Sequence, residues 1–243
     1  MLRVIPAVRG RAFHSWDVDE NEAKQIQLRL APLVVPLDDP TSRGLIGGVS
    51  IRSIDEMTVQ AAVSVLHLPG LKNAASAIAR AKSTVPYIPG LRAFQAGPAI
   101  LAAFEKLPAQ PDLVLWDGHG IAHPRRCGLA SHLGILLDIA SVGVSEELLY
   151  GRCHLNKLGE DRGSRTPLVD RTDGAEIGAA VRTRPHVNPV YVSVGHRVSL
   201  ESAIKIVLEC TPRYRMPEPL REARILCKRT AQRPSRRRGQ RDD

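Results

Sequence analysis

The sequence predicts an α/β protein in which a mixed β-sheet is flanked by helices. Apolar segments of strand type come first along the chain, and strands then alternate with amphipathic helices. The composition agrees, because 43% of the 243 residues are hydrophobic and only 4% are aromatic, as in aliphatic-rich α/β domains large enough to bury a full core. We therefore expect one domain over residues 1–227.

One helix is expected near the start of the chain, followed by strands. Asp17 and Glu20 have the spacing of a capping box, and apolar residues then recur at helical period, so a helix is expected over 18–31. Residues 45–51 and 58–68 are apolar and of strand length, and a short polar turn joins them. They predict a β-hairpin.

The middle of the chain is expected to alternate between loop, helix and strand. Residues 73–83 fit a strand or a helix equally well, whereas two prolines make 86–90 a loop. Pro98 is placed near a helix start, so an amphipathic helix is expected over 97–107. The apolar segment 111–117 has the pattern of a strand that is buried on both faces.

The later elements continue this alternation. Residues 125–138 predict a helix whose small residues allow close approach to a sheet. Short strands are expected at 141–145 and 189–195, and a helix over 199–210 is capped by Ser199. Strands and helices in this order indicate a mixed sheet with helices on its faces.

The positive charge is concentrated at the carboxyl terminus. The formal net charge is +9, and residues 228–243 hold seven Lys or Arg against two Asp, a net charge of +5. Because this segment lacks apolar residues to bury, we expect a disordered basic tail that contacts polyanions. A tail that only aids solubility is the alternative.

The sequence also limits the compartment. It has no run of 18 apolar residues, and its first residues lack a signal-peptide core, so we expect a cytoplasmic protein without a membrane partner. None of the four cysteines forms a CxxC pair, which favours buried, reduced thiols.

Asp117 ends the expected strand 111–117, directly before Gly118. In open α/β sheets ligands bind at the carboxyl edge of the strands, so Asp117 is a candidate site residue. The alternative is that Asp117 merely initiates a turn.

The segment after Asp117 narrows the chemistry. His119 and His123 have the spacing of metal ligands on a helix, but the surrounding glycines and Pro124 make a helix there improbable, which disfavours zinc. The glycines are too few for a dinucleotide fingerprint. A carboxylate, a glycine turn and the basic Arg125 and Arg126 together fit a Mg²⁺-dependent phosphodiester site.

Five segments resemble, in order, the motifs of the endonuclease V family. The resemblance covers about residues 16–226 and implies a ribonuclease H-like fold, a Mg²⁺ cofactor, and hydrolysis on the 3′ side of a deaminated purine such as hypoxanthine, as in DNA repair. The segments are GGVSI (47–51), PYIPGLRAFQAGPAIL (86–101), DGHGIAHPRRCGLASHLGILLD (117–138), PVYVSVGHRVSLESAI (189–204) and YRMPEPLREA (214–223).

Some working residues of the family are intact. By resemblance, Asp117 matches the central metal-binding aspartate, Tyr87 the wedge tyrosine beside the target base, and His196 a catalytic histidine. The residues expected to contact nucleic acid are Tyr87, Pro89, Gly90, Gly118, His119, Gly120 and Arg125.

Other family positions are changed. Ser50 stands where the family has a metal-binding aspartate, Ala96 where it has glutamate, Glu146 where it has lysine, and Arg224 where it usually has aspartate. Mg²⁺ is normally held by one or two carboxylates and phosphate oxygens, so Asp117 would be left alone. We expect Ser50, Ala96 and Asp117 to meet at one end of the sheet in a degenerate site.

Three functions follow as expectations. The first is a monomeric protein that binds nucleic acid, DNA or RNA, with hydrolysis lost or severely weakened. The second is an active nuclease that recruits Asp55, Glu56 or Glu146 as substitute metal ligands. The third is a non-catalytic protein that uses its basic tail to contact RNA or another polyanion.

Overall fold

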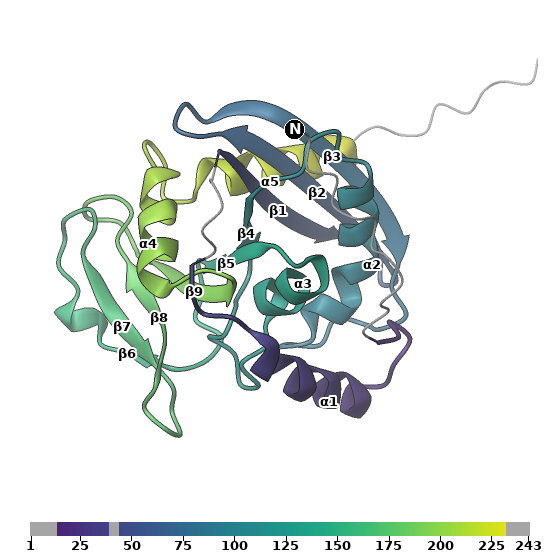
Figure 1. Cartoon of the computed structure of the whole chain (residues 1–243), viewed down its shortest axis with the longest axis horizontal. Helices are drawn as coiled ribbons and strands as arrows, with labels where there is room; N and C mark the ends of the chain where they lie inside the picture. Colours follow the sequence, from purple (N-terminus) through teal and green to yellow (C-terminus); the bar gives the residue numbers. More distant parts are fainter. Residues whose placement is uncertain (1–13, 39–43, 232–243) are drawn as a thin grey trace, which may run out of the picture.

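The computed structural model describes residues 14–38 and 44–231. These residues form a nine-stranded mixed sheet in the order β3-β2-β1-β4-β5-β9-β8-β7-β6 (Figure 1). The strands are β1 (Leu45–Ser53), β2 (Thr58–His67), β3 (Lys72–Lys82), β4 (Leu113–Asp117), β5 (Ala140–Ser145), β6 (Arg152–Cys153), β7 (Arg165–Val169), β8 (Glu176–Val181) and β9 (Val190–His196).

Helices cover both faces of this sheet. In Figure 1 α5 crosses β1 and β2 on one face, and α2 and α3 lie on the other. The helices are α1 (Glu20–Leu30), α2 (Arg92–Glu105), α3 (Leu129–Leu137), α4 (Leu200–Glu209) and α5 (Glu218–Ala231), with short 3-10 helices η1 (Ala31–Leu33) and η2 (Leu155–Lys157).

The centre of the sheet is parallel and its flanks are antiparallel. β4 runs parallel to both β1 and β5, whereas β2, β3 and β9 pair antiparallel to their neighbours. The carboxyl ends of β1, β4 and β5 therefore meet at one edge. The predicted α/β class with a mixed, helix-flanked sheet is confirmed.

Two apolar clusters hold the layers together. Val49 and Trp116 belong to the cluster under α2 and α3, whereas Ile46 and Leu115 belong to the cluster under α4 and the start of α5. Each fully buried side chain of this kind contributes about 1.5–3 kcal/mol. Because side chains alternate along a strand, the two clusters also show which face of the sheet each neighbouring residue occupies.

The first two helices begin at other residues than the sequence predicts. The N-cap of α1 is Asp19, whose Oδ1 accepts the Glu22 N–H at 2.8 Å, and not Asp17. Helix α2 begins at Arg92, so Pro98 lies inside it rather than at its start. Burial of Ala93 and Phe94 against the core explains the early start, and it outweighs the backbone hydrogen bond that proline cannot donate.

The remaining differences concern ambiguous or unpredicted segments. Residues 73–83 fall almost entirely in β3, because pairing with β2 buries alternate alanines on one face. Strands β6 to β8, at one end of the sheet, were not predicted, since they are short and interrupted by polar turns.

Helix α5 was also not predicted, and it includes the first four residues of the segment expected to be a tail. Residues 232–243, which hold most of that tail, lie outside the described residues.

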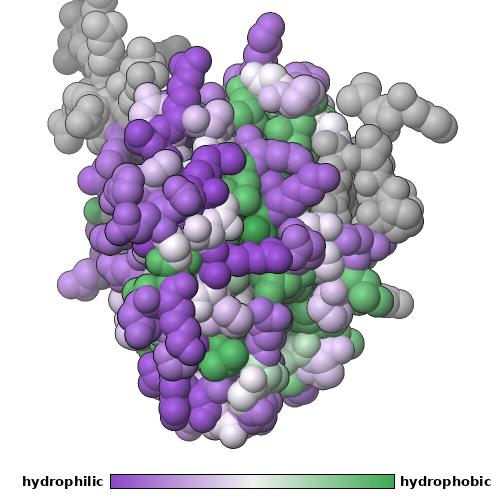
Figure 2. Space-filling view, turned by 90° about the vertical axis from the view of Figure 1, so that its left-hand side faces the viewer, coloured by the Kyte–Doolittle hydropathy of each residue, from purple (hydrophilic) through white to green (hydrophobic). Residues whose placement is uncertain are grey.

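Across the described ranges, no helix combines the length and apolar character needed to cross a membrane. Figure 2 views the molecule from the side of α4 and β6 to β8 and shows a mostly hydrophilic surface with a narrow apolar strip.

Candidate active site

The strand register brings Ser50 and Asp117 together. Val49 of β1 pairs with Trp116 of β4 in parallel, so the next residues, Ser50 and Asp117, are neighbours at the carboxyl edge. Val49 and Trp116 face α2, and by alternation Ser50 and Asp117 face α5. Gly48 allows α5 to lie this close, because a Cβ there would overlap the backbone of Pro219.

An arginine of α5 closes this edge of the sheet. The Arg224 guanidinium donates from Nε to Oδ2 of Asp117 and from Nη2 to Oδ1, both at 2.9 Å. Its Nη1 donates to Oε2 of Glu146 at 2.7 Å. Glu146 follows β5 directly, and because β4 and β5 are parallel it reaches the same edge as Asp117. Arg224 therefore bridges two carboxylates.

These contacts keep Arg224 charged. Hydrogen bonds to Asp117, followed by the charges of Asp117 and Glu146, raise its pKa above the ordinary value for arginine despite partial burial. The bidentate geometry with Asp117 is the strongest form of arginine–carboxylate contact. A fixed positive charge is thus part of the site.

Mg²⁺ does not fit this donor set. Both oxygens of Asp117 already accept from a cation, the neighbouring Ser50 supplies no negative charge, and the third acid of the family is Ala96. Within the described part of the chain, no group of three or more His, Cys, Asp or Glu is arranged to hold a metal ion.

Glu146, one of the acids considered as a substitute metal ligand, is paired with two cations of the chain. Its carboxylate is neutralised by Arg224 and by Arg215, whose Nη1 lies 3.1 Å from Oε1. The two departures from the family pattern, Glu146 for lysine and Arg224 for aspartate, have opposite signs. Those opposite signs were the sequence signal for this ion pair.

The other expected members of the site lie elsewhere. Ala96 is fully buried in the apolar cluster with Val49 and Trp116, on the face away from α5. Asp55 lies in the exposed β1–β2 turn, where its Oδ1 accepts the N–H groups of Met57 and Thr58, and these hydrogen bonds lower the pKa of Asp55. Of the expected three, only Ser50 and Asp117 are brought together.

A cavity of about 190 Å³ adjoins Asp117. Burial lowers the pKa of His119 and of His123 to about 4, so both imidazoles are neutral at pH 7. The cavity is lined by Tyr87, Gly90, Arg92, Asp117, Gly118, His119, His123, Gly128, Leu129, Ser145, Glu147, Leu148 and Leu149.

The loop that carries Tyr87 is anchored by hydrogen bonds to the carbonyl of Gly90. The carbonyl of Gly90 lies 2.8 Å from Nε2 of Gln27 and 2.9 Å from Nε2 of His123. Nε of Arg125 donates to Oε1 of Gln27 at 2.6 Å. Tyr87 itself remains 60% exposed above this support.

Comparison with known proteins gives the same picture over most of the chain. The family model for endonuclease V matches residues 29–225. Endonuclease V of Roseiflexus castenholzii is 46% identical over 219 residues, covering 90% of this chain and 96% of that protein. The chain belongs to the endonuclease V family.

Two solved structures show the family fold. Endonuclease V of Streptomyces avermitilis matches with a TM-score of 0.82 and 41% identity, over 89% of this chain and 94% of that one. The Ciona intestinalis enzyme, solved with a 24mer DNA containing an inosine, matches with a TM-score of 0.76 and 28% identity, over 87% and 98%. The ribonuclease H-like fold is confirmed, and the chain is a member of a family of nucleic-acid endonucleases.

Within this endonuclease V fold, His196 lies away from Asp117. It pairs with Ser141 at the start of β5, whereas Asp117 pairs with Val144 near its end. Its Nδ1 accepts the Val35 N–H at 3.3 Å. Because β9 runs antiparallel to β5, its carboxyl end reaches the opposite edge of the sheet, and the structure does not bring His196 to the site.

The glycine turn packs against the sheet instead of offering amides to phosphate. The Gly118 N–H donates to the carbonyls of Trp116 and Val144, and the Gly120 N–H donates to Oγ of Ser193 at 2.8 Å. A Cβ at Gly120 would overlap the backbone of Val194. The turn therefore shapes the cavity, while the amides of Gly118 and Gly120 are already used.

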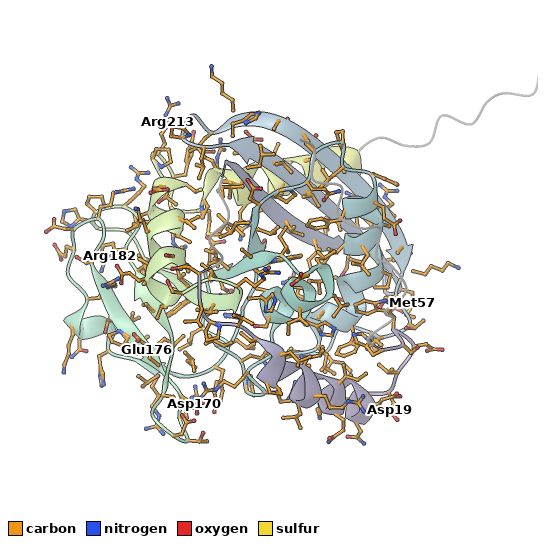
Figure 3. The ribbon with its side chains drawn as sticks, in the orientation of Figure 1. Asp19, Met57, Asp170, Glu176, Arg182 and Arg213 are labelled. Carbon is orange, nitrogen blue, oxygen red and sulfur yellow. The ribbon has the colours of Figure 1, made fainter. Side chains whose placement is uncertain are left out.

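The basic residues after this turn also have internal roles. Arg125 supports the Tyr87 loop through Gln27. Arg126 pairs with Asp170 at 2.8 Å and Asp173 at 3.0 Å (Asp170 is labelled in Figure 3). Neither arginine is therefore free to bind a phosphate. No motif indicated Gln27, whose side chain connects Arg125 to the Gly90 carbonyl.

Proposed function

We propose that this member of the endonuclease V family binds nucleic acid that contains a deaminated purine such as hypoxanthine, and that its metal-dependent hydrolysis is lost or severely weakened. The observation that carries the proposal is the Arg224 guanidinium bound to both oxygens of Asp117. This contact carries the proposal because the family is metal-dependent, and the Asp117 carboxylate that would bind the metal is already bound to the Arg224 guanidinium.

Electrostatics supports loss of the metal. A unit charge and a divalent ion 4 Å apart repel by about 8 kcal/mol at an effective dielectric of about 20. A metal at Asp117 would therefore require Arg224 to leave, and that would leave Glu146 with Arg215 as its remaining cation in the site. Loss of about 4 kcal/mol of metal assistance slows hydrolysis roughly a thousandfold.

The binding half is supported by different residues. Tyr87 stands at the mouth of the cavity, and the neutral His119 and His123 line it. Both ring nitrogens of His123 are bonded within the chain, whereas the neutral His119 imidazole offers one donor and one acceptor to the polar edge of a base. The related Ciona intestinalis protein was solved with inosine-containing DNA.

A cleavage assay tests the loss of hydrolysis. We expect no cleavage of a hypoxanthine-containing oligonucleotide above background with Mg²⁺ or Mn²⁺. We expect partial recovery in the triple variant Ser50→Asp, Glu146→Lys, Arg224→Asp. The change at Arg224 is required, because Glu146→Lys alone would place an ammonium beside the Arg224 guanidinium.

The matched control carries Ser50→Asn, Glu146→Lys and Arg224→Asn, which have similar shapes without the carboxylates. Recovery in both variants would remove the electrostatic argument. Strong metal-dependent cleavage by the unmodified chain, abolished by Asp117→Ala, would overturn the proposal in favour of an active nuclease.

A further inference from the structure

Two segments that line the cavity beside Asp117 are bound to one carboxylate of the β7–β8 hairpin. The first segment is 118–128, which contains the glycine turn, and the second is 145–149, which follows β5. The carboxylate belongs to Asp170, which follows β7 directly and lies in the loop at the tip of the hairpin (Figure 3). Asp170 is only 7% exposed, although it lies in a loop.

Arg126 connects Asp170 to the first segment. Its Nε donates to Oδ2 of Asp170 at 3.0 Å, and its Nη2 lies 2.8 Å from the same oxygen. The backbone of Arg126 has a positive φ of 52°, and its N–H donates to the carbonyl of His123, which lines the cavity. A non-glycine residue keeps such a φ when surrounding contacts hold it. The ion pair with Asp170 is one of these contacts.

Tyr150 connects Asp170 to the second segment. Its hydroxyl donates to Oδ1 of Asp170 at 2.9 Å, and Tyr150 directly follows residues 145–149. The neighbouring Arg171 holds the same place, because its Nε donates to the Gly151 carbonyl at 3.0 Å and its guanidinium lies over the Tyr150 ring, 5.8 Å from the centroid. The tip of the hairpin thus grips the end of this segment.

Thr172 fixes the carboxylate between these two partners. Its N–H and its Oγ1 both donate to Oδ1 of Asp170, at 2.8 and 2.6 Å. These hydrogen bonds, followed by those from Tyr150 and the charge of Arg126, hold the pKa of Asp170 well below its ordinary value. Asp170 therefore stays ionised, and both of its oxygens are used within the chain.

Recognition of a base depends on how accurately the lining of the cavity is placed. Hypoxanthine has a carbonyl where adenine has an amino group, so telling them apart needs hydrogen-bonding groups that are held to within about 0.5 Å. We propose that Asp170 is a positioning residue for base recognition, because it binds Arg126 and Tyr150 at once and so fixes the two lining segments relative to each other. The inference deepens the proposed function and rests on it.

A double-mutant cycle tests whether the two contacts act together. Tyr150→Phe removes only the hydroxyl, because the ring can still pack against the apolar cluster of Ala122, Leu168 and Ile177. Arg126→Gln removes the ion pair with Asp170. The measured quantity is the preference for hypoxanthine, which is the ratio of affinities for two single-stranded oligonucleotides with hypoxanthine or adenine at one position.

We expect this preference to fall about fivefold in Tyr150→Phe and about tenfold in Arg126→Gln, as for the loss of one hydrogen bond and of one charged contact. In the double variant it should fall by no more than about tenfold, because either change alone already releases the two segments from each other. Thermal unfolding of every variant separates loss of binding from loss of fold.

The salt dependence of binding distinguishes positioning from phosphate contact. Because Arg126 is paired with Asp170 and Asp173, Arg126→Gln should leave the slope of log affinity against log salt unchanged. A slope reduced by about 0.7, the value for one phosphate contact on a single strand, would make Arg126 a phosphate ligand and overturn the positioning role.

Amide hydrogen exchange measures the link without any ligand. In Tyr150→Phe, exchange should become faster near position 150 and also over 118–128, because the Tyr150 hydroxyl reaches that segment through Asp170. Tyr191→Phe is the matched control. Tyr191 packs against the same apolar cluster, but its hydroxyl interacts with Cys153 and not with Asp170, so exchange over 118–128 and the preference for hypoxanthine should stay unchanged.

The outcomes separate this inference from the proposed function. Faster exchange confined to the altered segment, or effects that multiply to about fiftyfold in the double variant, would overturn the inference and leave base recognition intact. An unchanged preference in both single variants would also overturn it. If the unmodified chain binds both oligonucleotides equally while exchange is coupled as expected, the base recognition of the proposed function is wrong, and the link through Asp170 stands without that role.

Discussion

The loop that carries Tyr87 and the carboxylate site at Asp117 line one cavity, yet they are stabilised by different interactions. The loop is anchored mainly by hydrogen bonds of uncharged groups, from Gln27 and a neutral His123 to the Gly90 carbonyl. At the Asp117 site, by contrast, the Arg224 guanidinium forms ion pairs with the carboxylates of Asp117 and Glu146.

This difference in interactions distinguishes the Tyr87 loop, which we propose binds the base, from the site at Asp117. Uncharged hydrogen bonds position a loop without attracting or repelling a metal or a phosphate, so the loop can retain a binding role. At the charged site a cation of the chain itself, Arg224, is bound to Asp117. The following predictions test this contrast, from the largest expected effect to the smallest.

Acid should destabilise the protein through its buried histidines. His119 and His123 have pKa values of about 4 in the folded chain against 6.5 ordinarily. Between these values the unfolded chain takes up protons that the folded chain excludes, so stability is complete above pH 6.5 and falls as the pH drops to 4. Each histidine contributes up to about 1.4 kcal/mol per pH unit.

Urea unfolding at several pH values measures this loss of stability. His123→Gln should reduce the slope of the unfolding free energy against pH by the contribution of one histidine, while its side-chain amide still offers a donor to the Gly90 carbonyl. An unchanged slope would mean that His123 is not buried in its neutral form.

Arg224→Ala should destabilise the fold by about 2 kcal/mol, less than for a fully buried pair because Arg224 is 29% and Asp117 21% exposed. Asp117 loses its cation and Glu146 keeps only Arg215. Chemical denaturation measures the loss. Arg224→Gln combined with Asp117→Asn is the control, and it should recover part of the stability because no carboxylate at position 117 is left unpaired.

Gln27→Leu should cost about 1 kcal/mol of stability, because the Gly90 and Cys127 carbonyls and the Arg125 guanidinium each lose one hydrogen-bond partner. The same variant should weaken binding of a hypoxanthine oligonucleotide, since the Tyr87 loop loses its support. Gln27→Glu is the contrast, because it keeps an acceptor for Arg125. Wild-type affinity in Gln27→Leu would show that the loop does not depend on this anchor.

Ser50→Ala should have the smallest effect, within about 0.5 kcal/mol of the unmodified chain and without change in oligonucleotide affinity. The physical reason is that an uncharged hydroxyl beside the Arg224–Asp117 pair adds little to it. Denaturation and binding assays measure both values. A marked loss of binding in Ser50→Ala would give this position a role that the charge pattern does not assign.

Much of the fold was predictable from local pattern. The β1–β2 hairpin, the short β4 and the Ser199-capped α4 follow from apolar spacing, turn residues and capping, which are read within a few residues. Local pattern did not predict that residues 73–83 form a strand, where α2 begins, or that strands β6 to β8 exist. Pairing across the sheet and burial against the core decide these features.

The candidate site divides in the same way. Asp117 at a strand end and Tyr87 in a proline-bounded loop were identifiable from the sequence, and Ser50 as its neighbour followed from the motif order. The position of His196 at the opposite edge required the antiparallel register of β9. The use of the glycine amides inside the turn required the packing of Gly120 on Val194.

By itself, the sequence determined the family and the mixed α/β fold, because these depend on residue identity and order. Only the tertiary structure decided that Arg224 bridges Asp117 and Glu146. The physical reason is distance. An ion pair is defined by side chains within about 4 Å, whereas Arg224 and Asp117 are 107 residues apart in the sequence.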